Sequence, residues 1–298
     1  MPPPPELACA VLSLGADPRL VDAVRSLRSQ DERVEVVVVN SGGGDPEALL
    51  ADAGLDVSVA DEPKPLFAGA ARNRGIDATT APYLAFLAAD CRAQPGWASA
   101  RLERHRAGAV AVAGVMANAR PDSRCAAAAM LLTHHRRLAH TPRQRRQFYS
   151  LSYDRRLFAR HGRFREEIRT GEDTDFNLRV TRGGDEVVWS SAAAAHEYPT
   201  AVAEFVRDQF ERGRRRAVAY AELDDRKSLR LAGRALINLP RCYRMARAAP
   251  DPAERRALTR AWPLLPAGTL AIAIGAASHL LSPGSSGEPR ALPWQHQT

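Results

Sequence analysis

Two groups of acidic residues have the types and spacing that chemistry on a bound ligand would need. Asp90 comes directly after the short apolar run Tyr83–Ala88 and the turn residue Ala89, and Pro95-Gly96 then breaks the chain. Open α/β sheets bind their ligands beyond the carboxyl ends of the strands, so a carboxylate at this place is a candidate ligand-binding group. The structural alternative is that Asp90 only caps the helix that follows.

The second group lies at the start of a predicted helix. Glu172, Asp173 and Asp175 fall within four positions there, and Phe176 and Leu178 turn one face of the helix inward. Acids in a first helical turn interact favourably with the helix dipole, which explains the group completely in structural terms. The chemical alternative is that the acids at the rim of this helix include a general base.

Two further segments are suited to phosphate, and one histidine accompanies them. Asn40–Asp45 is a glycine-rich turn after a buried strand, which would bring backbone N–H groups and a helix N-terminus to a ligand. It is neither a dinucleotide fingerprint nor a Walker A loop. The small-residue segment Gly69–Gly75 carries Arg72, whose guanidinium could pair with a diphosphate. His196 follows a short predicted strand; a lone histidine is commonly structural.

The composition indicates a globular protein with an excess of arginine. Of its 298 residues 45% are hydrophobic, and 42 Lys+Arg against 34 Asp+Glu give a formal net charge of +8. Arginine suits phosphate or anionic lipid partners, but a GC-rich coding bias explains the excess equally well. The 4 cysteines form no closely spaced pair, which argues against a zinc site or a disulfide framework. With no signal-peptide pattern after Met1, this predicts a cytoplasmic protein.

Apolar runs and turn signals predict strands that alternate with helices. Strands are expected at Leu7–Leu14, Val34–Val39, Asp56–Ala60, Tyr83–Ala88, Ala109–Met116, Phe148–Tyr153 and Glu186–Ser190. Helices are expected at Gly69–Thr79, Trp97–Gly108, Ala126–Ala139 and Asp154–Arg160. Further helices are expected to begin after Asp17, which would be an N-cap, after Asp45-Pro46, and at Glu172. Phe148–Tyr153 alternates like an edge or antiparallel strand. This order predicts an α/β fold with a mainly parallel, Rossmann-like sheet flanked by helices on both faces.

The chain after Ala201 is predicted to be helical almost throughout. The expected division is an α/β domain over 1–222, a helical region over 223–281, and a disordered tail over 282–298 that is rich in Pro, Gly and Ser. Trp262–Leu281 has the length of a membrane span and no formal charge, but its prolines and glycines make it poorly hydrophobic. We expect a membrane-dipping or docking hairpin there. The arginine-rich helical stretches Arg207–Arg216 and Arg226–Arg247 would form a basic surface on anionic lipid; a solvated helical cover is the alternative.

Five segments of the chain, in order, resemble motifs of the family 2 glycosyltransferases, which are GT-A fold enzymes that use nucleotide-sugar donors. The likeness runs from about Leu7 to Tyr220. The matching segments are Asn40–Asp45 for the family's Gly-Ser-x-Asp, Ala71–Gly75 for Ala-Arg-Asn-x-Gly, Phe86–Asp90 for Phe-Leu-Asp-x-Asp, Gly162–Glu166 for Gly-x-Phe-Asp-Glu, and Gly171–Asp175 for Gly-Glu-Asp-x-Asp. His196 ahead of the basic helix Gln209–Arg216 also resembles the family.

The resemblance implies an inverting, metal-assisted transfer of a sugar from a nucleotide-sugar donor to an acceptor hydroxyl. It implies that Asp173 is the general base with Glu172 in support, that Asp175 contacts the acceptor, and that Asp90 and His196 hold Mg²⁺ or Mn²⁺. The donor-binding residues that it implies are Leu14, Asn40, Ser41, Asp45, Arg72, Asn73, Ala89 and Asp90. A glycan or lipid-linked acceptor, as in polysaccharide biosynthesis, and a peripheral place at the inner face of the plasma membrane would suit the C-terminal region.

Two positions depart from the family's pattern. Ala88 replaces the first acid of the Asp-x-Asp pair, so metal binding would depend on Asp90, the donor phosphates and His196. Asn40 or Ser41 replaces the acid on the nucleoside side and carries no charge. One alternative is therefore a GT-A-like nucleotide-sugar-binding module with a decayed metal site, against which the intact Glu172-Asp173 pair argues. A nucleic-acid-binding protein ranks lower, because few aromatic residues accompany the arginine runs.

Overall fold

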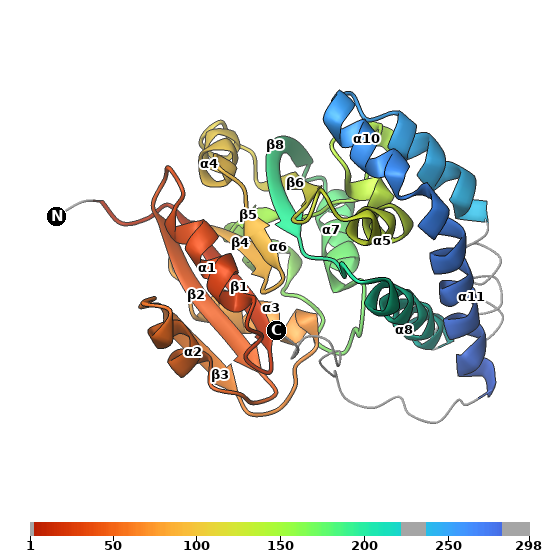
Figure 1. The fold of residues 1–298 in the computed structure, drawn as a ribbon. Coiled ribbons are helices and arrows are strands. Elements are labelled where there is room, and N and C mark those ends of the chain that lie inside the picture. Colours follow the sequence, from red (N-terminus) through yellow and green to blue (C-terminus); the bar gives the residue numbers. More distant parts are fainter. Residues whose placement is uncertain (1–2, 222–236, 282–298) are drawn as a thin grey trace. The chain divides into compact units, whose positions relative to one another are not determined.

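The computed structural model describes residues 3–221 and 237–281 (Figure 1). The chain divides into two compact units. The first contains Met1–Ala117 and Phe148–His196, and the second contains Asn118–Gln147 and Glu197–Gly287. The predicted domain limits near 222 and 281 adjoin residues outside the described part of the chain, and the predicted tail over 282–298 lies outside it. These limits stay predictions.

The first unit is built on a mixed sheet of 8 strands in the order β3-β2-β1-β4-β7-β6-β8-β5. The strands are β1 (Leu7–Leu14), β2 (Val34–Ser41), β3 (Ser58–Glu62), β4 (Tyr83–Ala88), β5 (Cys91–Ala93), β6 (Ala111–Asn118), β7 (Ser152–Asp154) and β8 (Val187–His196). β1 to β4 are parallel to one another, while β7 is antiparallel to β4 and β6, and β5 is antiparallel to β8. The predicted α/β class is confirmed, with an antiparallel half added to the parallel one.

Helices cover both faces of this sheet, as predicted. They are α1 (Leu20–Arg28), α2 (Pro46–Asp52), α3 (Ala68–Asp77), α4 (Trp97–Arg106), α6 (Arg156–His161) and α7 (Glu172–Arg182). Alternate residues of β1 enter two separate cores: Leu7, Cys9 and Val11 pack in the core that contains α1 and α4, whereas Ala8 and Ala10 pack in the core that contains α3, α6 and α7. This alternation follows from the two-residue period of a strand.

Three strands differ from the prediction by more than two residues at their ends. β7 is antiparallel, but it is short and lies between β4 and β6 rather than at an edge. Its Tyr153 is 1% exposed and packs against Phe164 and Phe176, so aromatic packing places this strand inside the sheet. β8 continues to His196 through a run of small residues, and β5, which was not predicted, pairs with its end. Small residues give no hydrophobic pattern, so only tertiary pairing defines these two strands.

The second unit is helical. Its helices are α5 (Arg124–His134), α8 (Val202–Ala221), a stretch over 237–247, α10 (Pro252–Arg260) and α11 (Leu265–Leu281), with 3₁₀ turns at His135–Arg137, Arg143–Arg145 and Trp262–Leu264. α8 and α11 pack at close range, because a Cβ on Gly213 would collide with the carbonyl oxygen of Ile272 and one on Gly275 with that of Phe210.

The predicted hairpin at Trp262–Leu281 is wrong: this segment is a 3₁₀ turn followed by one helix. Pro263 lies in the turn and Pro266 in the first turn of α11, where a missing N–H costs no hydrogen bond. The glycines serve close packing rather than chain reversal. By length and composition alone, the stretch Pro252–Ser278 could span a membrane, and 44% of its most apolar window is buried within the structure.

Candidate active site

Asp90 lies where three parallel strands end together. In the sheet register Leu14 is opposite Ser41, and Leu12 is opposite Ala88, so the residues after β1, β2 and β4 share one edge. The chain turns there, with Ala89 N donating to the carbonyl oxygen of Leu12 at 2.9 Å, and returns as β5. This turn places the Asp90 carboxylate at the sheet edge, as the sequence predicted.

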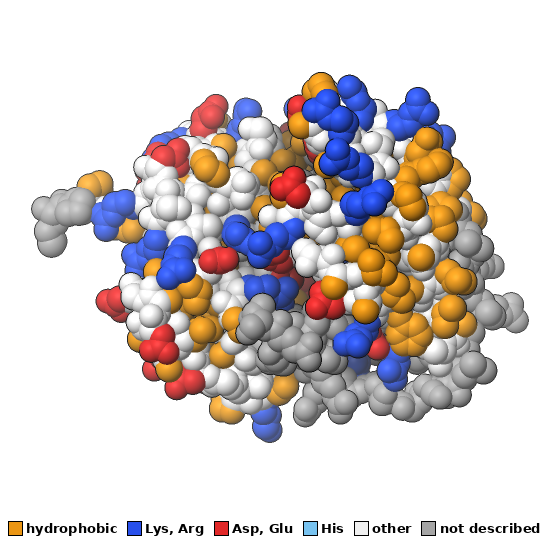
Figure 2. All heavy atoms as spheres, viewed as in Figure 1, with side chains coloured by type: hydrophobic (Ala, Val, Ile, Leu, Met, Phe, Trp, Pro, Cys, Tyr) orange, Lys and Arg blue, Asp and Glu red, His pale blue; other side chains and the backbone are white. Residues whose placement is uncertain are grey.

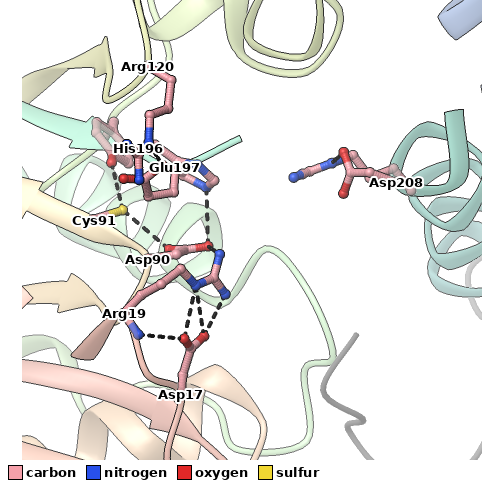
Figure 3. A network of polar contacts seen from close by, with 10 residues as sticks. Asp17, Arg19, Asp90, Cys91, Arg120, His196, Glu197 and Asp208 are labelled. Carbon is pink, nitrogen blue, oxygen red and sulfur yellow. Dashed lines mark hydrogen bonds and ion pairs between the residues drawn. The ribbon is translucent and has the colours of Figure 1, made fainter. Parts of the chain in front are cut away.

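The pairing of β5 with β8 brings His196 to Asp90. Cys91 is opposite His196 in this antiparallel register. As a result, His196 Nε2 lies 3.6 Å from Asp90 Oδ2, and the Cys91 thiol lies 3.4 Å from Asp90 Oδ1 (Figure 3). The histidine is therefore not past a short strand, as expected, but is the last residue of a long one.

These three side chains have ligand atoms within 4.8 Å of one another. An aspartate oxygen and an imidazole nitrogen suit Mn²⁺ or Mg²⁺. The Cys91 thiol is buried and close to the Asp90 carboxylate, and both effects raise its pKa well above the ordinary value. Cys91 is therefore a protonated neighbour, and Asp90 and His196 are the groups that fit a hard cation.

The loop after β1 adds an arginine to this site. Arg19 Nη1 lies 3.9 Å from Asp90 Oδ2, and its Nε and Nη2 form a fork on the Asp17 carboxylate at 2.9 and 2.5 Å. Asp17 was predicted to be an N-cap, but α1 begins three residues later, at Leu20. The carboxylate of Asp17 accepts from the backbone N of Arg19 at 3.0 Å, as a capping side chain does, and it also accepts from the Arg19 side chain.

The residues predicted to bind the nucleoside connect the loop after β1 to the loop after β2. Asn40 Oδ1 accepts from Ala16 N at 3.0 Å, and Asn40 Nδ2 donates to the Gly43 carbonyl oxygen and to Asp61 Oδ1 at 2.9 and 2.8 Å. Ser41 Oγ accepts from Leu66 N at 3.3 Å. Asp45 is exposed and caps α2 by accepting from Ala48 N at 2.8 Å. Half-buried Leu14 and buried Ala89 line the same edge of the sheet.

A second group of charges surrounds Arg72 in α3. Its Nη1 donates to Glu172 Oε1 at the start of α7, and its guanidinium lies 5.7 Å from the ring centroid of Phe86 and 5.4 Å from that of Phe164. Burial lowers the pKa of Arg72, but the negative charges of Glu172 and Asp173 more than offset this and raise it. Arg72 is therefore a permanent cation, paired with Glu172 and within the field of Asp173.

The family profile described as Glycosyl transferase family 2 matches residues 11–159, which is half of the chain. The chain belongs to this family. The match begins within β1 and ends within α6, so it includes Asp90 and Arg72. α7 and His196 lie beyond its end, so their assignment to the family's site depends on the contacts described here.

Solved structures with this fold include glycosyltransferases. A mannosyltransferase from Pyrobaculum calidifontis, solved with GDP-Man and Mn²⁺, is 18% identical, with 94% of this chain and 88% of that chain covered and a TM-score of 0.59. A glucosyl-3-phosphoglycerate synthase from Mycobacterium tuberculosis, in complex with Mn²⁺, UDP and phosphoglyceric acid, covers 65% of this chain and 72% of its own at 16% identity, with a TM-score of 0.45. The fold is GT-A. A search of curated proteins found no match.

Within this GT-A fold, Glu172 and Asp173 are in different environments. Glu172 is buried and committed to Arg72. Among the residues that the structure describes, the half-buried Asp173 accepts only from the residue that follows it, with Oδ1 2.7 Å from Thr174 N and 3.3 Å from Thr174 Oγ1. The geometry therefore favours Asp173 over Glu172 as the carboxylate that could exchange a proton with a substrate.

Two of the predicted site residues fasten the segment before α7. The Asn73 amide clamps Phe164, donating to its carbonyl oxygen at 2.9 Å and accepting from its N at 3.1 Å, and also donates to Glu166. Asp175 lies between Arg165 and Arg179, at 3.1 Å from a nitrogen of each. Contact of these two residues with a donor or an acceptor stays a prediction.

The residues that the sequence did not identify are Arg19, with Asp17 as its anchor, and Cys91. Asp17 and Arg19 follow the end of β1, just as Asp90 follows the end of β4, so their place relative to a strand end was a usable signal. The proposed chemistry requires that Asp90 and the Glu172–Asp173 pair face each other across one cleft, and this stays a prediction. The contacts form two groups, one on Asp90 and one on Arg72.

Proposed function

We propose that this protein is an inverting glycosyltransferase that moves a sugar from a nucleotide-sugar donor to an acceptor hydroxyl, with assistance from a divalent cation. The observation that carries the proposal is the meeting of Asp90 and His196 at the carboxyl edge of the parallel strands, 3.6 Å apart, in a member of this family. The solved structure with GDP-Man and Mn²⁺ has the same fold and supports the choice of donor class and cation.

The chain's own residues supply the acid–base and charge chemistry. Asp173 takes the proton from the acceptor hydroxyl while the hydroxyl oxygen forms a bond to the anomeric carbon. The bond from that carbon to the diphosphate oxygen breaks, and the nucleoside diphosphate leaves with the electron pair. Attack from the opposite side inverts the anomeric centre. Arg72 stabilises the negative charge of the departing group, and Glu172 keeps Arg72 in place.

A divalent cation held by Asp90 and His196 would add positive charge next to the donor's phosphates. With Ala88 in the place of a second acid, one carboxylate is available rather than two. We therefore expect weak binding of the cation alone and stronger binding once the phosphates complete its ligand set.

Calorimetry tests the donor and cation assignments together. Wild-type protein should bind UDP or GDP in the presence of Mn²⁺, and Asp90→Ala should lose the part of this affinity that depends on Mn²⁺. Asp52→Ala, which removes an exposed acid at the end of α2, is the matched control and should bind as the wild type does. Equal affinity of Asp90→Ala and wild type would remove Asp90 from the cation site.

Hydrolysis separates the enzyme from a binding module with a decayed site. A transferase without its acceptor commonly passes the sugar slowly to water, so UDP or GDP should be released from the matching nucleotide sugar with Mn²⁺. Binding without any release, in a panel of nucleotide sugars and acceptors, would favour the binding module. A thermal-shift screen of the same panel identifies the donor first, since a bound ligand raises stability with the logarithm of its excess over Kd.

A membrane surface is the partner that we propose for the second unit. Large apolar side chains are exposed on α8 and α11: Val202, Val206, Leu270 and Ile274 are 57%, 39%, 59% and 52% exposed. Figure 2 shows hydrophobic side chains gathered over the region of these helices. With the excess of arginine, this apolar face suits the interface of an anionic bilayer and a lipid-linked acceptor.

Flotation with vesicles tests this partner. The protein should rise with vesicles that contain phosphatidylglycerol, and Leu270→Ser/Ile274→Ser should stay at the bottom of the gradient. Recovery of the wild type only in the unbound fraction would contradict the membrane partner and leave the transferase proposal standing.

A further inference from the structure

Arg19 lies against the carboxylate that the cation site needs. Its Nη1 is 3.9 Å from Asp90 Oδ2, the same oxygen that His196 Nε2 approaches to 3.6 Å (Figure 3). Asp90 is thus flanked by a guanidinium on one side and an imidazole on the other. The side chains of Arg19 and Asp90 are 27% and 23% exposed, so both can reach a ligand from solution.

The place of Arg19 is fixed by the loop that carries it. Asp17 is 4% exposed and grips the guanidinium through two of its nitrogens, which leaves Nη1 directed to Asp90. Ala16, which has a φ of 51°, is held by the bond from its N to Asn40 Oδ1. A buried carboxylate and a hydrogen-bonded backbone therefore fix the position of Arg19, whereas a solvated surface arginine would have no fixed position.

The charges at this site follow from the residue at position 88. The exposed Ala88 brings no carboxylate, so Asp90 is the acid of this turn and Arg19 already neutralises part of its charge. Burial lowers the pKa of Arg19, but Asp17 and Asp90 more than offset this and raise it. The guanidinium is therefore a cation at every working pH.

We propose that Arg19 is a resident cation of the Asp90 site, which competes with a divalent cation for Asp90 and itself binds the donor's diphosphate. A guanidinium presents N–H donors in a planar fork that matches phosphate oxygens, so it can take over part of the work of a metal ion. The first half of this proposal concerns the chain alone; the second rests on the proposed function.

Binding of Mn²⁺ alone tests the competition. Removing a positive charge next to Asp90 with Arg19→Gln should tighten Mn²⁺ binding on the order of tenfold, as followed by the paramagnetic resonance signal of free Mn²⁺. Arg25→Gln removes the same charge from the exposed face of α1 and should leave Mn²⁺ affinity within about twofold of wild type. Unchanged or weaker Mn²⁺ binding by Arg19→Gln would overturn the competition.

A second pair of variants excludes a folding artefact. Arg19→Gln leaves the buried Asp17 carboxylate without its guanidinium, which destabilises the loop. Asp17→Asn/Arg19→Gln removes this uncompensated charge, and its reference is Asp17→Asn, which keeps Arg19. The double variant should bind Mn²⁺ more tightly than that reference; equal affinities would overturn the proposal.

Nucleotide binding in EDTA tests the second half. Wild-type protein should retain measurable affinity for UDP or GDP without a metal, and Arg19→Gln should weaken this affinity about tenfold or more. One substitution would then tighten Mn²⁺ binding and weaken nucleotide binding. A general loss of structure would weaken both. Wild-type protein that binds nucleotide only with Mn²⁺ would overturn the diphosphate role of Arg19, and one that binds none with or without Mn²⁺ would overturn the proposed function as well.

Discussion

Arg72 and Glu172 form an ion pair although 100 positions separate them in the sequence. The pair joins the middle of α3 to the first residue of α7, with the guanidinium 5.7 Å from the ring centroid of Phe86 and 5.4 Å from that of Phe164. α3 can lie this close to the sheet because Gly75 faces Ala10, where a Cβ would collide with that of the alanine. The glycine in α3 thus lets this helix approach the sheet, and Arg72 of the same helix then pairs with Glu172 of α7.

Glu172→Gln should destabilise the first unit by about 2–3 kcal/mol, because it leaves Arg72 without its partner. This is below the full cost for a buried pair, since the Arg72 side chain is 18% exposed. Urea unfolding gives the loss, and Glu62→Gln is the control. It breaks the exposed pair of Glu62 with Arg74 on the same helix and should cost less than about 1 kcal/mol. Equal losses of unfolding free energy in the two variants would show that the Arg72–Glu172 pair stabilises the protein no more than an exposed ion pair does.

Asp173→Asn should reduce turnover by about a hundredfold to ten-thousandfold and leave nucleotide affinity within about twofold of wild type. The fold should survive, because an asparagine oxygen can still accept from Thr174 N as the aspartate does at 2.7 Å. Steady-state rates and calorimetry on one preparation measure the two effects. A variant with wild-type turnover would remove Asp173 from the reaction and turn attention to Glu172.

The parallel half of the fold could be predicted from the sequence, because its strands are apolar runs between strong turn signals. Tyr83–Ala88 is found with the predicted bounds, and Val34–Val39 gains only its last two residues. Asp90 and Arg72 could be singled out for the same reason, as each follows or packs on one of these strands. Local pattern and tertiary structure agree there.

The site around Asp90 could not be predicted in full, because pairing between distant segments creates it. β5 has three residues and the end of β8 is a run of alanines, so neither has a hydrophobic pattern of its own. Their pairing determines that His196 lies beside Asp90. Arg19 was missed for another reason: Asp17-Pro18 matches a helix start, whereas the contact between Asp17 and Arg19 depends on side-chain geometry.

Asn73→Ala should free the segment that contains Phe164 and cost about 2–3 kcal/mol, because it leaves the backbone N and carbonyl oxygen of a buried residue without partners. Trypsin should then cut faster at Arg163 and Arg165, which are exposed on either side of Phe164. Asn118→Ala removes one exposed bond to Arg120 N and serves as the control. Unchanged cleavage of Asn73→Ala would contradict the clamp.

Stability should fall as the pH decreases from about 6.5 to 4, through His105. Burial lowers the pKa of this histidine to about 4, although the contact of its Nδ1 with the Ala109 carbonyl oxygen at 2.7 Å acts in the opposite direction. The ring is stacked on Tyr83, and its Nε2 lies 2.9 Å from Ser152 Oγ. In this pH range the unfolded chain takes up a proton at His105 and the folded protein does not, so protons favour unfolding. The full effect, reached near pH 4, is on the order of 3 kcal/mol.

His105→Gln isolates this contribution, because glutamine does not titrate. The variant should be less stable than wild type at pH 8, where the neutral histidine makes its contacts. Its stability should fall less steeply between pH 6.5 and 4, so that the two curves converge on acidification. Other histidines and the carboxylates contribute equally to both proteins and cancel in the difference. Curves from urea unfolding that stay parallel over this range would show that His105 is protonated in the folded state at an ordinary pKa.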